Sequence, residues 1–318
     1  MLNKLLGKRK KKEKFTEGMV RYKLTVGDVV FSVINYTVFI LFALICFYPF
    51  YYLFINTISN PTLVTKGVIT WRPRELDIDV YRQIFTNSTI LAAFKVTILR
   101  TLIGTSLMVL ATAFIGYLVT KQEMFGRKVL YRIIIITMYF SAGTIPWYLT
   151  MNSLGLTDNF LAYIIPAIVQ PYNIILVKTY IESIPAELEE SAKMDGASYL
   201  RVFWSIILPL SKPILATIAI FGAVGHWNAF MDSKMLMTNK NDLRTLQDVL
   251  QTYLVKATSI LSTGAEGGTI SEADTVKAMS ARAQSIAISM ASILPIVCVY
   301  PFMMRYFEKG IMIGAVKG

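Results

Sequence analysis

The chain has 318 residues, of which 54% are hydrophobic and 16% carry a charge, whereas an average soluble domain has about 25% charged residues. The apolar residues gather in long runs, which excludes an ordinary soluble protein and indicates a polytopic membrane protein. The net charge is +12. An uncharged apolar run follows the basic N-terminus, so this charge indicates cytoplasmic retention and attraction to anionic lipid rather than binding to nucleic acid.

Residues 1–27 form a basic segment with nine Lys and Arg against two Glu. We expect a cytoplasmic N-terminal tail here and one transmembrane domain over residues 28–318. The apolar run that follows is too long for the core of a signal peptide, and no A-x-A site ends it, so a cleaved signal is not expected.

Six apolar runs reach the length of about 20 residues that a membrane-spanning helix needs. The sequence therefore predicts an all-α membrane protein with six transmembrane helices. They are placed at Val29–Phe54, Ile90–Val119, Leu130–Leu149, Phe160–Val177, Ile206–Phe230 and Ser285–Tyr306.

The distribution of basic residues predicts the orientation of these spans. The segment between the second and third runs holds four basic residues and one acid, the turn between the third and fourth holds none, and the C-terminal tail over 307–318 is basic. Short basic segments stay in the cytoplasm. Both termini, and the segment between the fourth and fifth runs, are therefore expected there. The long segment 234–283 lies outside, and its Leu residues recur at helical spacing after Leu243.

The stretch Glu190–Pro213 is the most informative part of the chain, and the elbow predicted at its start covers about residues 184–200. Ser183 and Pro185 stand where a helix N-terminus favours a cap and a fixed φ. Three acids follow in the first turns, where they complement the helix dipole: Glu187, Glu189 and Glu190. Leu188, Ser191 and Ala192 would form a narrow face of small or apolar side chains, suited to close approach by another surface.

The same segment contains a predicted break and restart. Gly196 can adopt the left-handed conformation that ends a helix, and Ser198 can cap the next helix, which continues into the fifth run. Pro209 and Pro213 lie near its entry to the membrane, where kinks are tolerated. The result is a helix–break–helix elbow at the inner surface, and the alternative is an ordinary interfacial helix between two spans.

Candidate residues along a transport path are Lys95 and Arg100 in the second run, and His226, Trp227 and Asn228 in the fifth. Ionisable side chains inside a membrane usually face the bundle or water, and Trp and Asn suit the apolar face and hydroxyls of a sugar. The alternatives are that Lys95 extends toward the membrane surface, that Arg100 has a structural ion pair, and that His226 is a packed residue.

No catalytic constellation of nucleophile, base and orienting group is visible, and a single His without a Cys or acid cluster argues against a metal site. The chain also lacks the G-x-x-x-x-G-K-[ST] pattern that holds nucleotide phosphates. We therefore expect a protein that is not an enzyme and binds no cofactor itself.

The sequence I-P-A-E-L-E-E-S-A-K-M-D-G-A-S, followed nine residues later by L-P-L-S-K-P, resembles the EAA motif of permease subunits of ATP-binding-cassette importers. Ser191 replaces the usual Ala. Three further segments resemble the carbohydrate-uptake branch, in particular the second, maltose-permease-like subunit and the systems for lipoprotein-linked and complex-polysaccharide uptake. They are Ser141–Leu156, Gly225–Asn228 and Gly310–Gly318.

This resemblance implies a type I importer permease fold, in which the elbow is the coupling helix that docks on the ATPase. It further implies a heterodimer with a homologous second permease, two ATPase subunits that bind ATP and Mg²⁺, and an extracellular solute-binding protein, all at the bacterial cytoplasmic membrane. The residues implied in coupling are Glu187, Glu190, Ser191, Ala192, Asp195, Gly196, Ala197 and Ser198, and, in the tail, Gly314, Ala315, Val316, Lys317 and Gly318.

The function implied is import of oligosaccharides, and the basic Arg100 favours sugars that contain uronic acids. The alternative is a membrane scaffold or sensor subunit that uses the elbow only to dock a cytosolic partner. An ATPase that co-purifies, with ligand-stimulated hydrolysis, would distinguish the transporter from the scaffold.

Overall fold

The computed structural model describes residues 25–265 and 272–315. Most of the basic N-terminal tail, and Val316, Lys317 and Gly318 of the C-terminal tail, lie outside the described residues. Within the described part the elements are helical, and the one β pairing is an isolated antiparallel bridge between Ser59 and Leu76. The chain divides into two compact units, Met1–Tyr52 and Leu53–Gly318.

The described part of the first unit is one long apolar helix. Helix α2, Val26–Thr57, runs through this unit and ends in the second. Its 32 residues would extend about 48 Å at 1.5 Å per residue, more than the roughly 30 Å of a bilayer core. Nearly all its large apolar side chains before Tyr52 are exposed, as a helix that faces lipid or a partner subunit requires. The predicted first span is confirmed as a helix.

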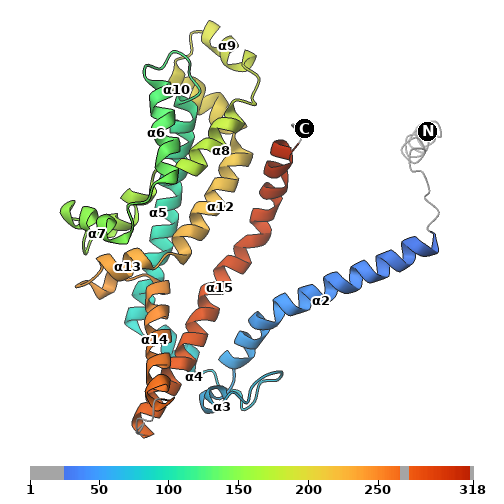
Figure 1. The fold of residues 1–318 in the computed structure, drawn as a ribbon, viewed down its shortest axis with the longest axis vertical. Helices are drawn as coiled ribbons and strands as arrows, with labels where there is room; N and C mark the ends of the chain where they lie inside the picture. The colour runs from blue at the N-terminus through green and yellow to red at the C-terminus, as the bar shows by residue number, and fades with distance from the viewer. Residues whose placement is uncertain (1–24, 266–271, 316–318) are drawn as a thin grey trace, which may run out of the picture. The chain divides into compact units, whose positions relative to one another are not determined.

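The second unit is built around helix α5, Ser88–Leu118 (Figure 1). The helix begins where the side chain of Asn87 accepts hydrogen bonds from the backbone N–H groups of Thr89 and Ile90, at 3.0 and 3.3 Å. Helices α8 and α12 pack along it, and it confirms the predicted second run as a single helix. These helices are α8, Pro171–Ile181, and α12, Lys212–Asn228.

Three of the predicted spans are not straight helices. The third run, Leu130–Leu149, divides into α6, Arg127–Tyr139, and α7, Thr144–Ser153, because residues 140–143 leave the helical conformation. Prolines mark the other two breaks, since proline removes a backbone donor and restricts the residue before it. The fourth run bends by 45° and the fifth by 79°. Their pieces are η1, Phe160–Tyr163, η2, Ile165–Ala167, and α8; then α10, Tyr199–Val202, the π-helix η3, Phe203–Ile207, α11, Leu208–Leu210, and α12.

In the described residues, three helices are long and apolar enough to cross a membrane, or up to five if each bent pair is one span. The count of six therefore stays a prediction. The third of these helices lies within α15, Glu272–Ala315, which contains the predicted sixth run.

Shorter helices complete the unit. The predicted helical spacing after Leu243 is confirmed by α14, Leu246–Ala265. The others are α3, Pro61–Thr65, α4, Asp79–Thr86, α9, Glu187–Met194, α13, Met231–Leu236, and η4, Asn241–Leu243.

Two buried apolar clusters lie at opposite ends of α5. The first joins the start of α5 to α4, α14 and α15, and its centre includes Ile90, Leu246 and Ile288. The second joins the end of α5 to α8, α10, η3 and α12, around Tyr117 and Phe203. We call these regions the loop end and the elbow end; Figure 1 shows α14 near the first and α9 near the second.

Candidate functional site

The elbow consists of α9, a tight break and α10. Gly196 has a φ of +80°, which is the left-handed conformation predicted for it. The N–H of Gly196 donates to the carbonyl of Lys193 at 2.9 Å, and the N–H of Ala197 donates to that of Ala192 at 3.0 Å, which is the Schellman arrangement of a helix end. Ser198 then caps α10 by accepting from the N–H of Arg201 at 3.4 Å. Both local predictions are confirmed.

The prediction that Ser183 caps the elbow helix is wrong. Helix α9 begins at Glu187, and no side chain caps its N-terminus at Ala186. The hydroxyl of Ser183 instead donates to the carbonyl of Tyr180 at 2.6 Å, so it closes the last turn of α8. A serine between two helices can serve either neighbour, and here the preceding helix uses it.

Glu189 fixes the inner face of α9 to the end of α5. Its carboxylate forms an ion pair with the Nζ of Lys121 and accepts from the hydroxyl of Tyr117 at 3.3 Å. The side chains of Glu189 and Lys121 are only 14% and 13% exposed. Lys193 adds ion pairs at 3.3 Å to Glu189 and 3.6 Å to Glu123. The elbow is therefore attached to the core by charge as well as by packing.

The environment of Glu189 favours its ionised form. Burial by itself would raise the pKa of the carboxyl, but the hydrogen bond and charge of Lys121, followed by those of Lys193, outweigh it and lower the pKa. Sequence reasoning included Glu189 among the helix-dipole acids and missed its role as an anchor. Its spacing within α9 could not reveal the Lys121 partner, 68 residues earlier.

The opposite face of α9 is open. Glu187, Glu190, Ser191 and Met194 are exposed, at the i, i+3, i+4, i+7 spacing of one helical face; Met194 is 88% exposed. Among the other candidate coupling residues, Asp195, Gly196 and Ser198 are also exposed, while Ala192 and Ala197 pack against the elbow-end cluster. In the tail, Gly314 and Ala315 end helix α15.

A cavity of about 520 Å³ lies where α5, α8 and α12 meet. Of the candidate path residues, Arg100 and His226 line it. Trp227 is buried elsewhere and donates from Nε1 to the carbonyl of Ser292 at 3.0 Å. The amide of Asn228 donates to the carbonyl of Val224 in its own helix at 3.0 Å, and Lys95 is exposed on α5. The structure therefore separates residues that the sequence grouped together.

The charge of Arg100 is balanced inside the protein. Its guanidinium forms a part-buried ion pair with Asp232, donates to the carbonyl of Ala229 at 3.2 Å and lies 4.6 Å above the ring of Tyr163. The side chain is 3% exposed. Because these contacts hold the guanidinium against α13, Arg100 presents little net positive charge to the cavity. The same contacts connect α5 to the end of α12.

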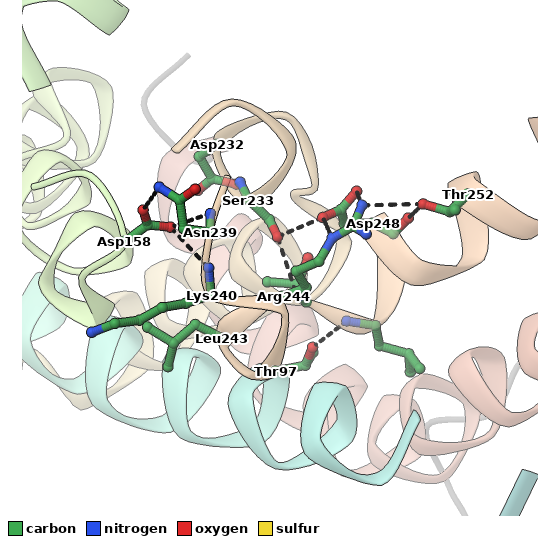
Figure 2. A network of polar contacts seen from close by, with 12 residues as sticks. Thr97, Asp158, Asp232, Ser233, Asn239, Lys240, Leu243, Arg244, Asp248 and Thr252 are labelled. Atoms are coloured by element: carbon green, nitrogen blue, oxygen red, sulfur yellow. Dashed lines mark hydrogen bonds and ion pairs between the residues drawn. The ribbon is translucent and has the colours of Figure 1, made fainter. Parts of the chain in front are cut away.

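The loop end is held by a polar network, shown in Figure 2. The carboxylate of Asp248, which is fully buried, accepts two hydrogen bonds at 2.8 Å from Arg244 and one at 2.9 Å from the hydroxyl of Ser233. The hydrogen bond with Asp248 raises the pKa of Arg244. The hydroxyl of Thr97 in α5 accepts from the N–H of Leu246 at 2.9 Å, so α14 starts directly on α5.

A second contact closes the same region. The side chain of Asp158 accepts hydrogen bonds from the N–H groups of Asn239 and Lys240, at 2.9 and 3.2 Å (Figure 2). The hydrogen bond from the Asn239 backbone lowers the pKa of this carboxyl. The turn after α7 is thereby joined to the segment after α13, more than 80 residues later.

Comparison with known proteins supports one family. The family model described as "Binding-protein-dependent transport system inner membrane component" matches residues 112–313. Protein LplC of Bacillus subtilis (strain 168) is 37% identical over 272 residues, 85% of this chain and 89% of that protein. The polygalacturonan/rhamnogalacturonan transport system permease protein YtcP of the same organism is 33% identical over 288 residues, 91% of this chain and 98% of its own.

A solved structure is also similar. It is a chain of a bacterial ABC transporter involved in the import of the acidic polysaccharide alginate, with a TM-score of 0.76 and 31% sequence identity. The match covers 89% of this chain and 98% of that one.

Proposed function

The chain belongs to the family of binding-protein-dependent transport system inner membrane components, the permease subunits of ATP-driven importers, and we propose that it moves oligosaccharides into a bacterial cell. It is a transport subunit, and a separate subunit hydrolyses ATP. The similar proteins named for sugar polymers support oligosaccharide as the substrate class.

The substrates we propose are fragments of polysaccharides, including acidic ones. One relative is named for polygalacturonan and rhamnogalacturonan, and the similar structure is described for the acidic polysaccharide alginate. Arg100 does not supply the acid selectivity in this proposal, because Asp232 already balances its charge. Selection of a carboxylate then rests with the binding protein or the second permease.

The observation that carries the proposal is the two-faced elbow. Glu189 anchors one face of α9 to the end of α5, while Glu187, Glu190, Ser191 and Met194 leave the other face exposed. A partner bound to the exposed face would pull on the end of α5 through the part-buried ion pair of Glu189 with Lys121 and the hydrogen bond from Tyr117. In this mechanism, closure of the ATPase subunits draws the elbow inward, and the helices attached to it rotate as a rigid group.

The assembly we propose has this chain paired with a homologous second permease, two ATPase subunits on the elbow side and a binding protein on the loop end. Both termini and the elbow then face the cytoplasm, as the basic short segments favour. In this arrangement the C-terminal tail, residues 314–318, would contact the ATPase subunits.

The test is to purify the tagged chain from a membrane and reconstitute it in proteoliposomes with its binding protein. An ATPase should co-purify, and sugar-loaded binding protein should stimulate ATP hydrolysis together with uptake of labelled oligosaccharide. A scaffold subunit would bring a partner without sugar-stimulated hydrolysis, and that result would reject the proposal.

A further inference from the structure

The cavity between α5, α8 and α12 contains buried polar groups with unused hydrogen-bonding capacity. The residues His226 and Asn173 are only 5% and 6% exposed, and both line the cavity. Among the residues that the structure describes, none forms a hydrogen bond with the His226 ring, and Asn173 has only a contact of 3.6 Å from its amide nitrogen to the sulfur of Met108. Buried polar groups of this kind normally have partners.

The position of the imidazole is set by a close approach between two helices. A Cβ at Gly104 in α5 would lie 2.6 Å from both Cε1 and Nε2 of His226. The ring therefore rests directly on the backbone of α5, and the absence of a side chain at residue 104 makes room for it. A polar ring held this rigidly, with no partner in the described chain, is suited to a ligand.

The rest of the lining supplies what a sugar ring needs. Tyr172 and Phe221 line the cavity with partly exposed aromatic rings, which can stack on the C–H face of a pyranose. Gln170 adds an amide beside them. The volume of about 520 Å³ lies within the range of about 300–1,000 Å³ of small-molecule sites. Asp232 neutralises Arg100, the one charged residue among the described residues of the lining.

We propose that this cavity binds one pyranose unit of the transported oligosaccharide. The cavity recognises the hydroxyl groups of that unit and not a carboxylate. His226 and Asn173 exchange hydrogen bonds with sugar hydroxyls, and the Tyr172 and Phe221 rings hold the apolar face. The inference rests on the proposed transport function and adds that this subunit itself contacts the sugar.

The test uses the complete complex in proteoliposomes, with radiolabelled trigalacturonate as the acidic probe and maltotriose as the neutral probe. Asn173→Leu and His226→Leu remove hydrogen bonds while keeping apolar volume. Each should lower uptake of the transported sugar about tenfold, the loss expected for one deleted hydrogen bond. Stimulation of ATP hydrolysis by the loaded binding protein should stay at the wild-type level, because the elbow is unchanged.

Two controls separate this effect from misfolding. Thr217→Val removes a buried hydroxyl of α12 that bonds the carbonyl of Pro213 and does not line the cavity, and it should leave uptake unchanged. His226→Gln restores a donor and an acceptor and should recover part of the uptake. A structural role alone would predict that the Gln and Leu variants assemble and transport equally poorly.

A second readout is chemical protection. In a background of Cys46→Ser and Cys298→Ser, a cysteine introduced by Tyr172→Cys should react with a thiol reagent, and the transported sugar should slow the reaction. Wild-type uptake by both Leu variants, or labelling that the sugar does not slow, would overturn the site and leave the transport function standing. Failure of the wild-type complex to import either sugar would reject both.

Discussion

The two ends of α5 are held by different chemistry. At the loop end, the hydroxyl of Thr97 in α5 accepts a hydrogen bond from the backbone N–H of Leu246. Beside it, the fully buried carboxylate of Asp248 binds Ser233 and Arg244, which lies four residues before it. At the elbow end, Glu189 of α9 forms an ion pair with Lys121, which lies just beyond the end of α5, and both side chains are long. The contact of Thr97 with the backbone resists displacement, whereas a pair of long side chains between two elements can follow a moving helix.

We therefore expect the two ends of α5 to have different roles. The loop end stays fixed in the fold, and the elbow end transmits the motion of the ATPase subunits to α5. Changes at the loop end should therefore reduce stability without altering the ratio of ATP hydrolysed to sugar imported. Changes at the elbow should alter that ratio and reduce stability less than changes at the loop end.

The largest expected effect is that of Asp248→Ala. The change leaves Arg244 and Ser233 without their shared acceptor in a buried network, which we expect to destabilise the protein by about 3 kcal/mol. The measurement is the thermal midpoint of the purified complex. Thr252→Val, at the edge of the same network, is the control and should change it much less. If Asp248→Ala altered coupling in the surviving complex, the proposed difference in roles would be wrong.

The next effect is that of Gly196→Ala. The substitution meets no atom within 4 Å, but the φ of +80° makes it strained by about 1–2 kcal/mol. We expect the elbow angle to relax and the ATP used per sugar to rise severalfold. Gly155→Ala, at a φ of +68° near the loop end, carries the same kind of strain and should leave the ratio unchanged. Equal effects of the two variants would argue against a special role for the elbow.

Glu189→Gln should have a smaller effect, because it keeps the shape of the side chain and removes only its charge. We expect a loss of about 1 kcal/mol in the attachment of α9 and a measurable rise in ATP used per sugar. The double variant Glu189→Lys with Lys121→Glu should restore part of the coupling. Glu182→Gln, which removes an exposed pair with Lys178 on α8, should change nothing.

The smallest effect is on pH dependence. The lowered pKa of Glu189 means that its ion pair stabilises the elbow fully above the unfolded value of about 4.3 and loses this contribution as the pH falls through the lower, folded value. The difference in thermal midpoint between the wild type and Glu189→Gln should be constant from about pH 5 to 7 and shrink below about pH 4. A difference that shrank already near pH 6 would contradict this assignment.

Local rules were enough to predict part of the elbow. The left-handed Gly196 and the Ser198 cap depend only on neighbouring backbone, so their sequence context specified them. The prediction that Ser183 caps α9 was wrong because the end of α8 and the start of α9 compete for the same hydroxyl group. The long helices α2 and α5 were predictable from their apolar runs, while the break at residues 140–143 was not, because α6 and α7 together have the composition of a single span.

Two ion pairs join residues that lie far apart in the chain, and the one at Arg100 agrees with the structural alternative given for that residue. Glu189 pairs with Lys121 and Arg100 with Asp232, at separations of 68 and 132 residues. Spacing within one helix carries no information about such a partner. Trp227 and His226 are neighbours in sequence, but adjacent residues on a helix point about 100° apart, so one bonds α15 while the other faces the cavity.

The Arg100–Asp232 pair also has a consequence for biogenesis. Helix α5 is synthesised 132 residues before Asp232, which is roughly 10 seconds at about 5–20 residues per second. During that interval the arginine must be accommodated in the insertion machinery or the bilayer without its acid, at about 2.5–3.5 kcal/mol for a central position. The second span is therefore fully stabilised only after the segment beyond the fifth span has been synthesised. A chain truncated before Asp232 should be retained and degraded.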